Sequence, residues 1–110
     1  MGEDLERSIE LLKKRFEDPE VVKSLSGFTK VVIFEFPDVG KSYTFNIENG
    51  LLKSVIEGAQ GQGDIRITMS STTFTDIMSK KANPIREYQL GRITVKGSMS
   101  DLLKMRKLLL

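Results

Sequence analysis

Cysteine, histidine and tryptophan are absent from this chain of 110 residues. Without cysteine, the chain can form neither a disulfide nor a thiolate metal site, and it has no thiol nucleophile. Without histidine, it lacks the imidazole of a Ser-His-Asp triad and of histidine-based metal sites. These absences remove most hydrolase and metalloenzyme mechanisms. We therefore expect a protein that is not an enzyme and that holds no metal and no cofactor.

Long apolar runs are also missing. No stretch approaches the roughly 20 apolar residues that a membrane-spanning helix needs, and the acidic, amphipathic first ten residues do not resemble a secretory signal. Hydrophobic residues make up 39% of the chain and charged residues 29%, a balance typical of a folded domain. The sequence therefore predicts one domain over residues 1–110, located in the cytoplasm.

Charge is distributed unevenly along the chain. The net charge is only +2, but residues 80–110 carry eight basic and two acidic side chains, whereas residues 1–79 carry more acidic than basic ones. Such a gradient often marks a face that meets an anionic partner, although surface charge also falls unevenly without one. Nucleic acid is a poor candidate, because few aromatic side chains besides Tyr88 are free to stack among these cations.

Hydrophobic periodicity predicts a mixture of helices and strands. Residues 3–16 repeat apolar side chains at helical spacing, and Asp18-Pro19 then begins a short second helix. From Phe28 the period changes to two, and this alternation predicts five strands, the last of which includes Ile93 and Val95. Helix caps at Ser70, Asn83 and Ser98 predict three further helices. The glycine-rich residues 58–64 are predicted to form a mobile connection.

Asn49-Gly50 predicts a two-residue type I′ hairpin turn. Regular pairing from that turn places Ser54 opposite Phe45, on an otherwise apolar face of the hairpin. This serine has two interpretations. It either lies near a sheet edge that water reaches, or it provides a polar contact inside a binding cavity.

The last predicted helix distributes its side chains in an unusual way. Most of its apolar residues fall on one stripe, and these are Met99, Leu102, Leu103, Leu109 and Leu110. Arg106 lies in the middle of this stripe, and Leu108 falls on the opposite, polar side. Either the helix frays after Met105, or Arg106 extends from the mouth of a pocket. Both interpretations make this segment a loosely held lid.

Residues 64–109 contain a series of motifs: an alternating strand that ends at Ser70, Phe74 in a short helix, Lys81-Ala82-Asn83-Pro84, the strand Gly91-Arg92-Ile93-Thr94-Val95-Lys96-Gly97, and an apolar-basic helix. This series resembles the sterol carrier protein 2 domain, a family of small lipid-binding α/β domains. The chain departs from the family in two places. Lys80-Lys81 stands where the family usually has Gly-Lys, and Leu90 precedes Gly91 where several members have glutamine.

The resemblance implies an α+β fold with a five-stranded, mostly antiparallel sheet, helices packed on one face, and an apolar cavity between sheet and helices. The cavity would hold a sterol, a fatty acyl chain or a related lipid without covalent chemistry, under the C-terminal helix as a lid. The predicted lipid-binding residues are Phe34, Phe36, Phe45, Ser54, Met69, Phe74, Ile77, Met78, Val95, Met99, Leu102 and Leu103. Methionine is frequent on adaptable apolar binding surfaces, but it also fills gaps in ordinary cores.

Two further expectations concern partners. Lys104, Arg106 and Lys107 are predicted to meet an anionic membrane surface, with the apolar tip at residues 108–110 touching the interface. The alternative function is a solid-packed structural or dimerisation module of the same fold, without a lipid ligand. In that case Val31 and Ile33, on the sheet face opposite Phe34, form an apolar patch that pairs two copies.

Overall fold

The computed structural model describes residues 2–109. In chain order, the helices and strands are α1 (Gly2–Arg15), α2 (Pro19–Ser24), β1 (Lys30–Phe36), β2 (Lys41–Glu48), β3 (Leu51–Glu57), β4 (Ile65–Met69), α3 (Ser71–Met78), α4 (Pro84–Gln89), β5 (Ile93–Lys96) and α5 (Met99–Leu109). Every predicted element is present and in the predicted order. Two helices are followed by four strands, two helices, the last strand and the last helix, as the hydrophobic periodicity predicts.

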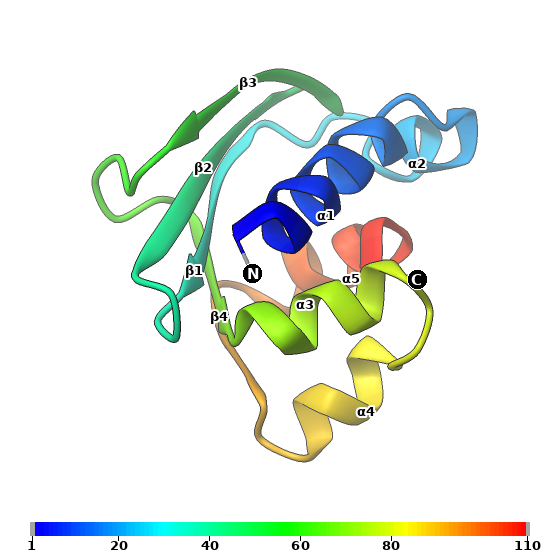
Figure 1. Ribbon diagram of the computed structural model, residues 1–110. Coiled ribbons are helices and arrows are strands. Elements are labelled where there is room, and N and C mark those ends of the chain that lie inside the picture. Colours follow the sequence, from blue (N-terminus) through cyan, green and yellow to red (C-terminus); the bar gives the residue numbers. More distant parts are fainter. Residues whose placement is uncertain (1, 110) are drawn as a thin grey trace.

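The strands form one five-stranded sheet in the order β3-β2-β1-β4-β5. Neighbouring strands are antiparallel except β1 and β4, which are parallel. All the helices lie on the same face of this sheet (Figure 1). The predicted fold class, an α+β domain with a mostly antiparallel sheet and helices on one face, is confirmed.

Helix starts were predictable because they depend on local chemistry. The side chains of Asp18, Ser70 and Asn83 each accept a hydrogen bond from a backbone N–H in the first turn of the helix that follows. Proline then occupies the first position of both α2 and α4, where its missing N–H costs nothing. Ser98 Oγ likewise accepts a hydrogen bond from the Asp101 N–H in the first turn of α5, so all the predicted caps are confirmed.

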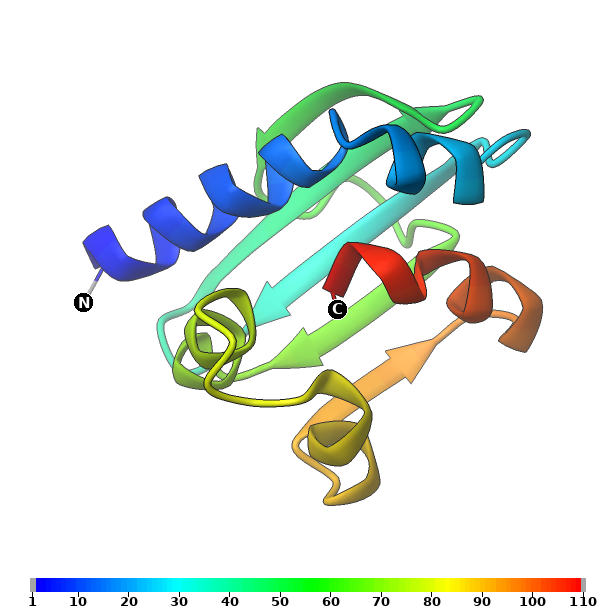
Figure 2. The same cartoon turned by 90° about the vertical axis from the view of Figure 1, so that its right-hand side faces the viewer.

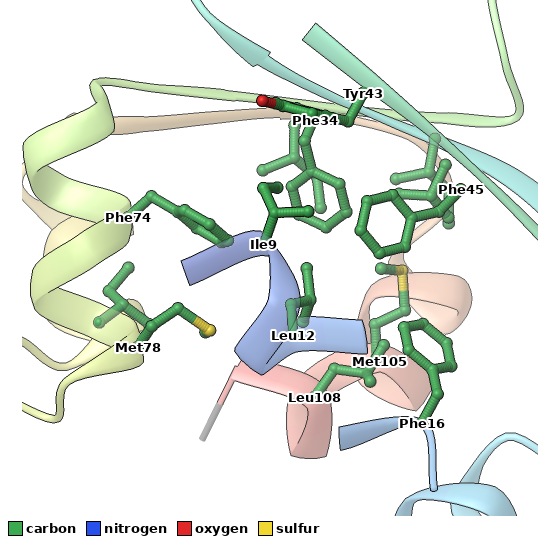
Figure 3. Close-up of a cluster of buried hydrophobic side chains, with 14 of the residues drawn as sticks. Ile9, Leu12, Phe16, Phe34, Tyr43, Phe45, Phe74, Met78, Met105 and Leu108 are labelled. Carbon is green, nitrogen blue, oxygen red and sulfur yellow. The ribbon is translucent and has the colours of Figure 1, made fainter. Parts of the chain in front are cut away.

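An aromatic core lies between the sheet and the helices (Figure 3). We define it by five phenylalanine side chains, and these are Phe16, Phe34, Phe36, Phe45 and Phe74. The ring centroids of Phe34 and Phe45 lie 5.1 Å apart, as do those of Phe36 and Phe74. Ile9 of α1 and Leu108 of α5 pack against this core from the helical layer. Each of these side chains is almost fully buried, so the centre of the domain is filled by the protein itself.

The hairpin turn between β2 and β3 forms as predicted. Asn49 and Gly50 both have positive φ, of 51° and 80°, as a type I′ turn requires. A side chain at Gly50 would also place its Cβ 2.8 Å from the carbonyl oxygen of Leu25. The first pairs after the turn, including Ile47 with Leu52, have the predicted register.

The register changes one pair later, so the predicted pairing of Ser54 with Phe45 is wrong. Of the two interpretations of Ser54, the structure agrees with a serine at a sheet edge that water reaches, because β3 is an edge strand and Ser54 is exposed. A β-bulge makes Lys53 an extra residue, so Ser54 pairs with Asn46 and Val55 takes the place opposite Phe45. Ser54 is exposed, and its Oγ accepts a hydrogen bond of 2.9 Å from Asn46 Nδ2. A shift of one residue exchanges the faces of a strand. Ser54 therefore lies on the side of the sheet opposite the helices, away from any apolar interior.

The glycine-rich residues 58–64 fold back onto the outer face of the sheet. Thr44 Oγ1 donates a hydrogen bond of 2.7 Å to the Gly58 carbonyl and accepts one of 3.0 Å from the Gln60 N–H. Asp64 closes the segment by exchanging hydrogen bonds with the backbone of β1. This connection is therefore attached to the sheet at several points along its length.

This segment covers part of the patch that was predicted to pair two copies of the chain. Ile33 is fully buried, although it lies on the sheet face that carries no helix. A Cβ at Gly63, whose φ is +70°, would lie 3.0 Å from the Ile33 side chain. The prediction that Ile33 belongs to an exposed dimerisation patch is therefore wrong, and Val31 beside it is only partly exposed.

Candidate functional site

An apolar pocket of about 320 Å³ lies between α4, β5 and α5, and we call it the α4–α5 pocket. In Figure 2, α4 and α5 lie on either side of β5, at one end of the sheet. The lining residues are Ile67, Pro84, Ile85, Tyr88, Ile93, Val95, Met99, Leu102, Leu103, Met105, Arg106 and Leu109. All of them come from the second half of the chain.

The edge of the sheet provides the floor of the α4–α5 pocket. Alternation along β5 directs Ile93 and Val95 to the helical side of the sheet. Val95 pairs with Ile67 of β4, so the two side chains lie next to each other on that face. β5 is an edge strand, so the floor is only two strands wide.

The short helix α4 forms one wall. Its pocket side carries Ile85 and Tyr88, which are 46% and 50% exposed. Glu87, on the same helix, does not line the pocket. Its carboxylate is largely buried and accepts hydrogen bonds of 3.1 and 2.9 Å from Arg92 Nη1. This ion pair, together with the Asn83 cap, holds the helix so that its apolar side remains uncovered.

The other wall is α5, which is apolar on two faces. Met105 and Leu108 are buried in the core, at 3% and 1% exposure. Leu108 therefore packs inward, and its predicted position on a polar side is wrong. Leu102, Leu103 and the rest of the predicted stripe instead face the α4–α5 pocket. Leu110, the final member of that stripe, lies outside the described residues.

Arg106 lies in the middle of the pocket-facing stripe, as the helical wheel predicts. Helix α5 remains regular through Leu109, so the interpretation in which it frays after Met105 is wrong. Arg106 is exposed and lines the α4–α5 pocket among apolar side chains. Of the two interpretations of this arginine, the structure supports a position at the pocket.

Polar contacts attach α5 to the rest of the domain at both ends. Near its start, Asp101 lies 3.7 Å from Lys30 Nζ. At its end, Arg15 Nη1 donates a hydrogen bond of 2.7 Å to the Leu108 carbonyl oxygen, one of the carbonyls left unpaired at a helix C-terminus. Partial burial lowers the pKa of Arg15 from its ordinary value. The predicted lid is thus a helix fixed to α1 and to the start of β1.

The predicted site residues divide into three groups. Val95, Met99, Leu102 and Leu103 are brought together along the α4–α5 pocket. Seven others are buried in and around the aromatic core, not along the pocket, and these are Phe34, Phe36, Phe45, Met69, Phe74, Ile77 and Met78. Ser54 lies on the other face of the sheet. The sequence interpretation missed the α4 wall, although the i, i+3 spacing of Ile85 and Tyr88 was a signal for it.

Two other hollows in the described part of the chain are lined mostly by polar and charged residues. The larger, of about 680 Å³, is an open depression along α1 in which Leu11 is the one apolar side chain among Glu6, Arg7, Glu10 and Lys14. The other lies between α1 and α3. It is lined by Asp4, Arg7, Ser8, Thr75, Asp76, Ser79 and Lys81. Neither offers an apolar surface comparable to that of the α4–α5 pocket.

Within residues 2–109, no group of three or more aspartate or glutamate side chains is arranged to hold a metal ion. No helix in the described part of the chain is both long and apolar enough to cross a bilayer.

The arrangement of the strands and of the helical layer is that of the sterol carrier protein 2 fold. A crystal structure of sterol carrier protein 2 superposes with a TM-score of 0.73 at 12% identity, and covers 93% of this chain and 87% of that one. Palmitated sterol carrier protein 2-like 2 from Aedes aegypti gives 0.73 at 17% identity, and covers 93% and 90%. These similarities confirm the resemblance at the level of the fold.

Residues 24–110 match the family described as alkyl sulfatase C-terminal, and the chain belongs to that family. The stereoselective inverting sec-alkylsulfatase Pisa1 from Pseudomonas sp. has a TM-score of 0.65 at 18% identity over 80% of this chain. The match covers only 14% of the Pisa1 chain, so this chain corresponds to a small part of that enzyme.

Proposed function

We propose that the domain binds the apolar chain of a lipid or another amphiphile in the α4–α5 pocket, without covalent chemistry. The observation that carries the proposal is the exposure of the pocket walls. Ile85, Tyr88, Met99 and Leu103 are all at least 46% exposed, whereas the aromatic core is buried. Covering such surface stabilises a complex by about 25 cal/mol for each Å² of apolar area removed from water.

The size of the pocket and the names of similar proteins support a single-chain ligand. A volume of about 320 Å³ is close to the lower limit of ligand sites in proteins. One protein of the same fold was studied with palmitate, and a protein similar to this chain acts on secondary alkyl sulfates. In a longer protein of the alkylsulfatase kind, this domain would hold an alkyl chain while catalysis takes place elsewhere.

A displacement titration tests this function. A fluorescent long-chain fatty acid is expected to bind saturably, with one site per chain, and to be displaced by unlabelled fatty acid. Leu102→Trp places a large side chain inside the pocket and is expected to abolish saturable binding. Leu51→Trp, at an exposed position on β3, is the matched control and should bind as the unaltered protein does. Equal binding by both variants, or no saturable binding at all, contradicts the proposal.

The alternative function, a structural or dimerisation module, is favoured by the filled aromatic core. Large buried side chains occupy the space between the sheet, α1 and α3, so that part of the domain is a packed scaffold. Any contact between copies would have to use a surface other than Ile33. A concentration-dependent dimer in sedimentation equilibrium, together with no fatty acid binding, would favour this function over lipid binding.

We further propose that ligand exchange takes place at an anionic membrane surface reached from the cytoplasm. Lys104, Arg106 and Lys107 lie on α5, each able to contribute up to ~1 kcal/mol near anionic headgroups. Because Leu108 is buried, the apolar contact would come instead from Met99 and Leu103, which are 66% and 62% exposed. Lys107 lies 3.4 Å from Glu20 Oε2, so headgroups would compete with that exposed ion pair.

Vesicle co-sedimentation at low salt tests the membrane proposal. Binding to vesicles of anionic phosphatidylglycerol is expected to exceed binding to neutral phosphatidylcholine vesicles, and Leu103→Ser is expected to weaken it. Leu51→Ser is the control, since Leu51 is exposed but distant from α5 in the fold. Equal binding to both kinds of vesicle would show that the cations of α5 do not select the surface.

A further inference from the structure

We infer that Arg106 is a specificity-determining residue, and that it selects single-chain ligands whose head group is an anion. This inference rests on the proposed function, since it assumes that the α4–α5 pocket holds an apolar chain. It goes further by stating which chemical class of amphiphile the pocket prefers and which side chain makes the choice.

The charge of the α4–α5 pocket comes from one side chain. Arg106 is the one charged residue among its lining side chains, and the other polar group is the phenol of Tyr88. The carboxylates carried by the two helical walls face other cations, since Glu87 is bound to Arg92 and Asp101 to Lys30. Arg106 itself forms no ion pair with any residue in the described range 2–109. The pocket therefore carries a positive charge that no side chain of residues 2–109 neutralises.

Arg106 lies on the same face of α5 as two apolar side chains of the pocket. Leu102 precedes it by four residues and Leu109 follows it by three, so all three side chains lie on one face of the helix. All three line the α4–α5 pocket. A ligand chain against the two leucines would place its head group within reach of a guanidinium on the same face. This arrangement fits an amphiphile with one apolar chain and one polar end.

The guanidinium of Arg106 is suited to binding an anionic head group. Arginine donates hydrogen bonds in a fixed planar geometry that fits carboxylate and sulfate oxygens, and such charge-assisted bonds are about twice as strong as neutral ones. An alcohol head group can accept a hydrogen bond from Arg106 but offers no charge. The pocket therefore distinguishes an anionic amphiphile from an alcohol with the same chain.

Calorimetry with three ligands of equal chain length tests this inference. Dodecyl sulfate, dodecanoate and dodecanol are titrated separately, the two anions below their critical micelle concentrations and the alcohol below its solubility limit. For the unaltered protein, we expect both anions to bind about tenfold more tightly than the alcohol, which corresponds to roughly 1.4 kcal/mol. Comparison of the two anions shows whether the pocket prefers sulfate or carboxylate, and either order supports selection by charge.

Two matched variants assign the preference to Arg106. Arg106→Gln is expected to bind the anions and the alcohol about equally, because the glutamine amide can donate a hydrogen bond but carries no charge. Folding should be retained, since Arg106 is exposed. Arg86→Gln removes the same charge from α4 at an exposed position that does not line the pocket. It should retain the preference.

The outcomes separate this inference from the proposed function. If the alcohol binds but the anions have no advantage, or if both variants lose that advantage equally, the role of Arg106 is refuted while chain binding stands. If none of the three ligands binds the unaltered protein, the proposed function and this inference are refuted together.

Discussion

The aromatic core and the α4–α5 pocket are built from the same kinds of side chain, but they differ in what covers them. Phe34 and Phe45 are no more than 2% exposed, because α1, α3 and α5 all press onto the centre of the sheet. At the β5 edge, only α4 and one face of α5 are present, and Leu103 remains 62% exposed. The difference between the buried core and the exposed pocket therefore lies in how many helices cover the sheet at each place, and not in the types of residue.

Helix α5 belongs to both regions and makes the comparison direct. Its buried face, with Met105 and Leu108, completes the core. Its neighbouring face, which includes Leu102 and Arg106, borders the α4–α5 pocket. Substitutions on the first face should therefore change stability, and substitutions on the second should change binding.

The largest expected effect is in the core. Phe45→Ala is expected to reduce the free energy of unfolding by about 3–5 kcal/mol, because it removes a buried ring and leaves a cavity. Leu103→Ala, on the exposed face of α5, should change stability by no more than about 0.5 kcal/mol. Urea denaturation of both variants checks the comparison. Similar losses in the two variants would show that the pocket face also supports the fold.

Arg15 joins the two regions, since it extends from α1 to the end of α5. Arg15→Met is expected to lower the free energy of unfolding by about 1.5 kcal/mol, the range expected for a hydrogen bond with one charged partner. Hydrogen exchange should show the last turn of α5 losing protection while the strands keep theirs. Lys14→Met is the control on the same helix. Uniform loss of protection over all elements would contradict a local role.

Asp38 anchors the turn after β1 to the start of α3, because its carboxylate accepts hydrogen bonds from the backbone N–H and the hydroxyl of Ser71. The side-chain hydrogen bond from Ser71 is the main reason why the pKa of Asp38 is below its ordinary value of 3.8. The stabilisation is therefore present above about pH 5, declines as the pH falls through the lowered pKa, and is absent below it.

Asp38→Asn should cost roughly 0.5 kcal/mol at neutral pH, since solvent screens an exposed carboxylate. The difference from the unaltered protein should be smaller in acid than at neutral pH, because protonation of Asp38 removes the charge that asparagine lacks. Thermal unfolding at the two pH values, with Glu48→Gln as an exposed control, measures it. A difference of the same size in acid would show that the charge of Asp38 is irrelevant.

Tyr43 gives the smallest expected effect. Its hydroxyl is buried without a hydrogen-bond partner among the described residues, and burial raises the pKa of this phenol. Tyr43→Phe removes an unsatisfied polar atom and keeps the ring, so stability should stay the same or rise slightly. Thermal unfolding tests this. A clear loss of stability would mean that the hydroxyl has a partner in solution.

The sequence predicted the fold well because its signals are local. Caps such as Ser70 and the Asn49-Gly50 turn depend on a few neighbouring residues. The bulge at Lys53 left no comparable signal, and this is why Ser54 was placed on the wrong face. The burial of Ile33 depends on a glycine-rich segment folding back across the sheet, which alternation within a strand cannot reveal.

The candidate site was only partly predictable. Arg106 in an apolar stripe was visible from helical spacing, and it indicated the correct face of α5. The phenylalanines were assigned to a cavity because hydrophobic side chains that face inward look the same whether they pack together or surround a space. Which of these occurs depends on how helices cover the sheet, and that is a property of the tertiary structure.

The pocket draws all its lining from Ile67 onward, whereas the strands of the hairpin and the first two helices come earlier in the chain. If the domain binds ligands as proposed, their selection would be encoded mainly in residues 84–109, at one margin of the sheet. Randomising these residues alone should give variants that bind ligands of different length or polarity, while the rest of the fold is unchanged. Substitutions in the pocket would then change which ligands bind, while the hairpin and the first two helices keep the fold.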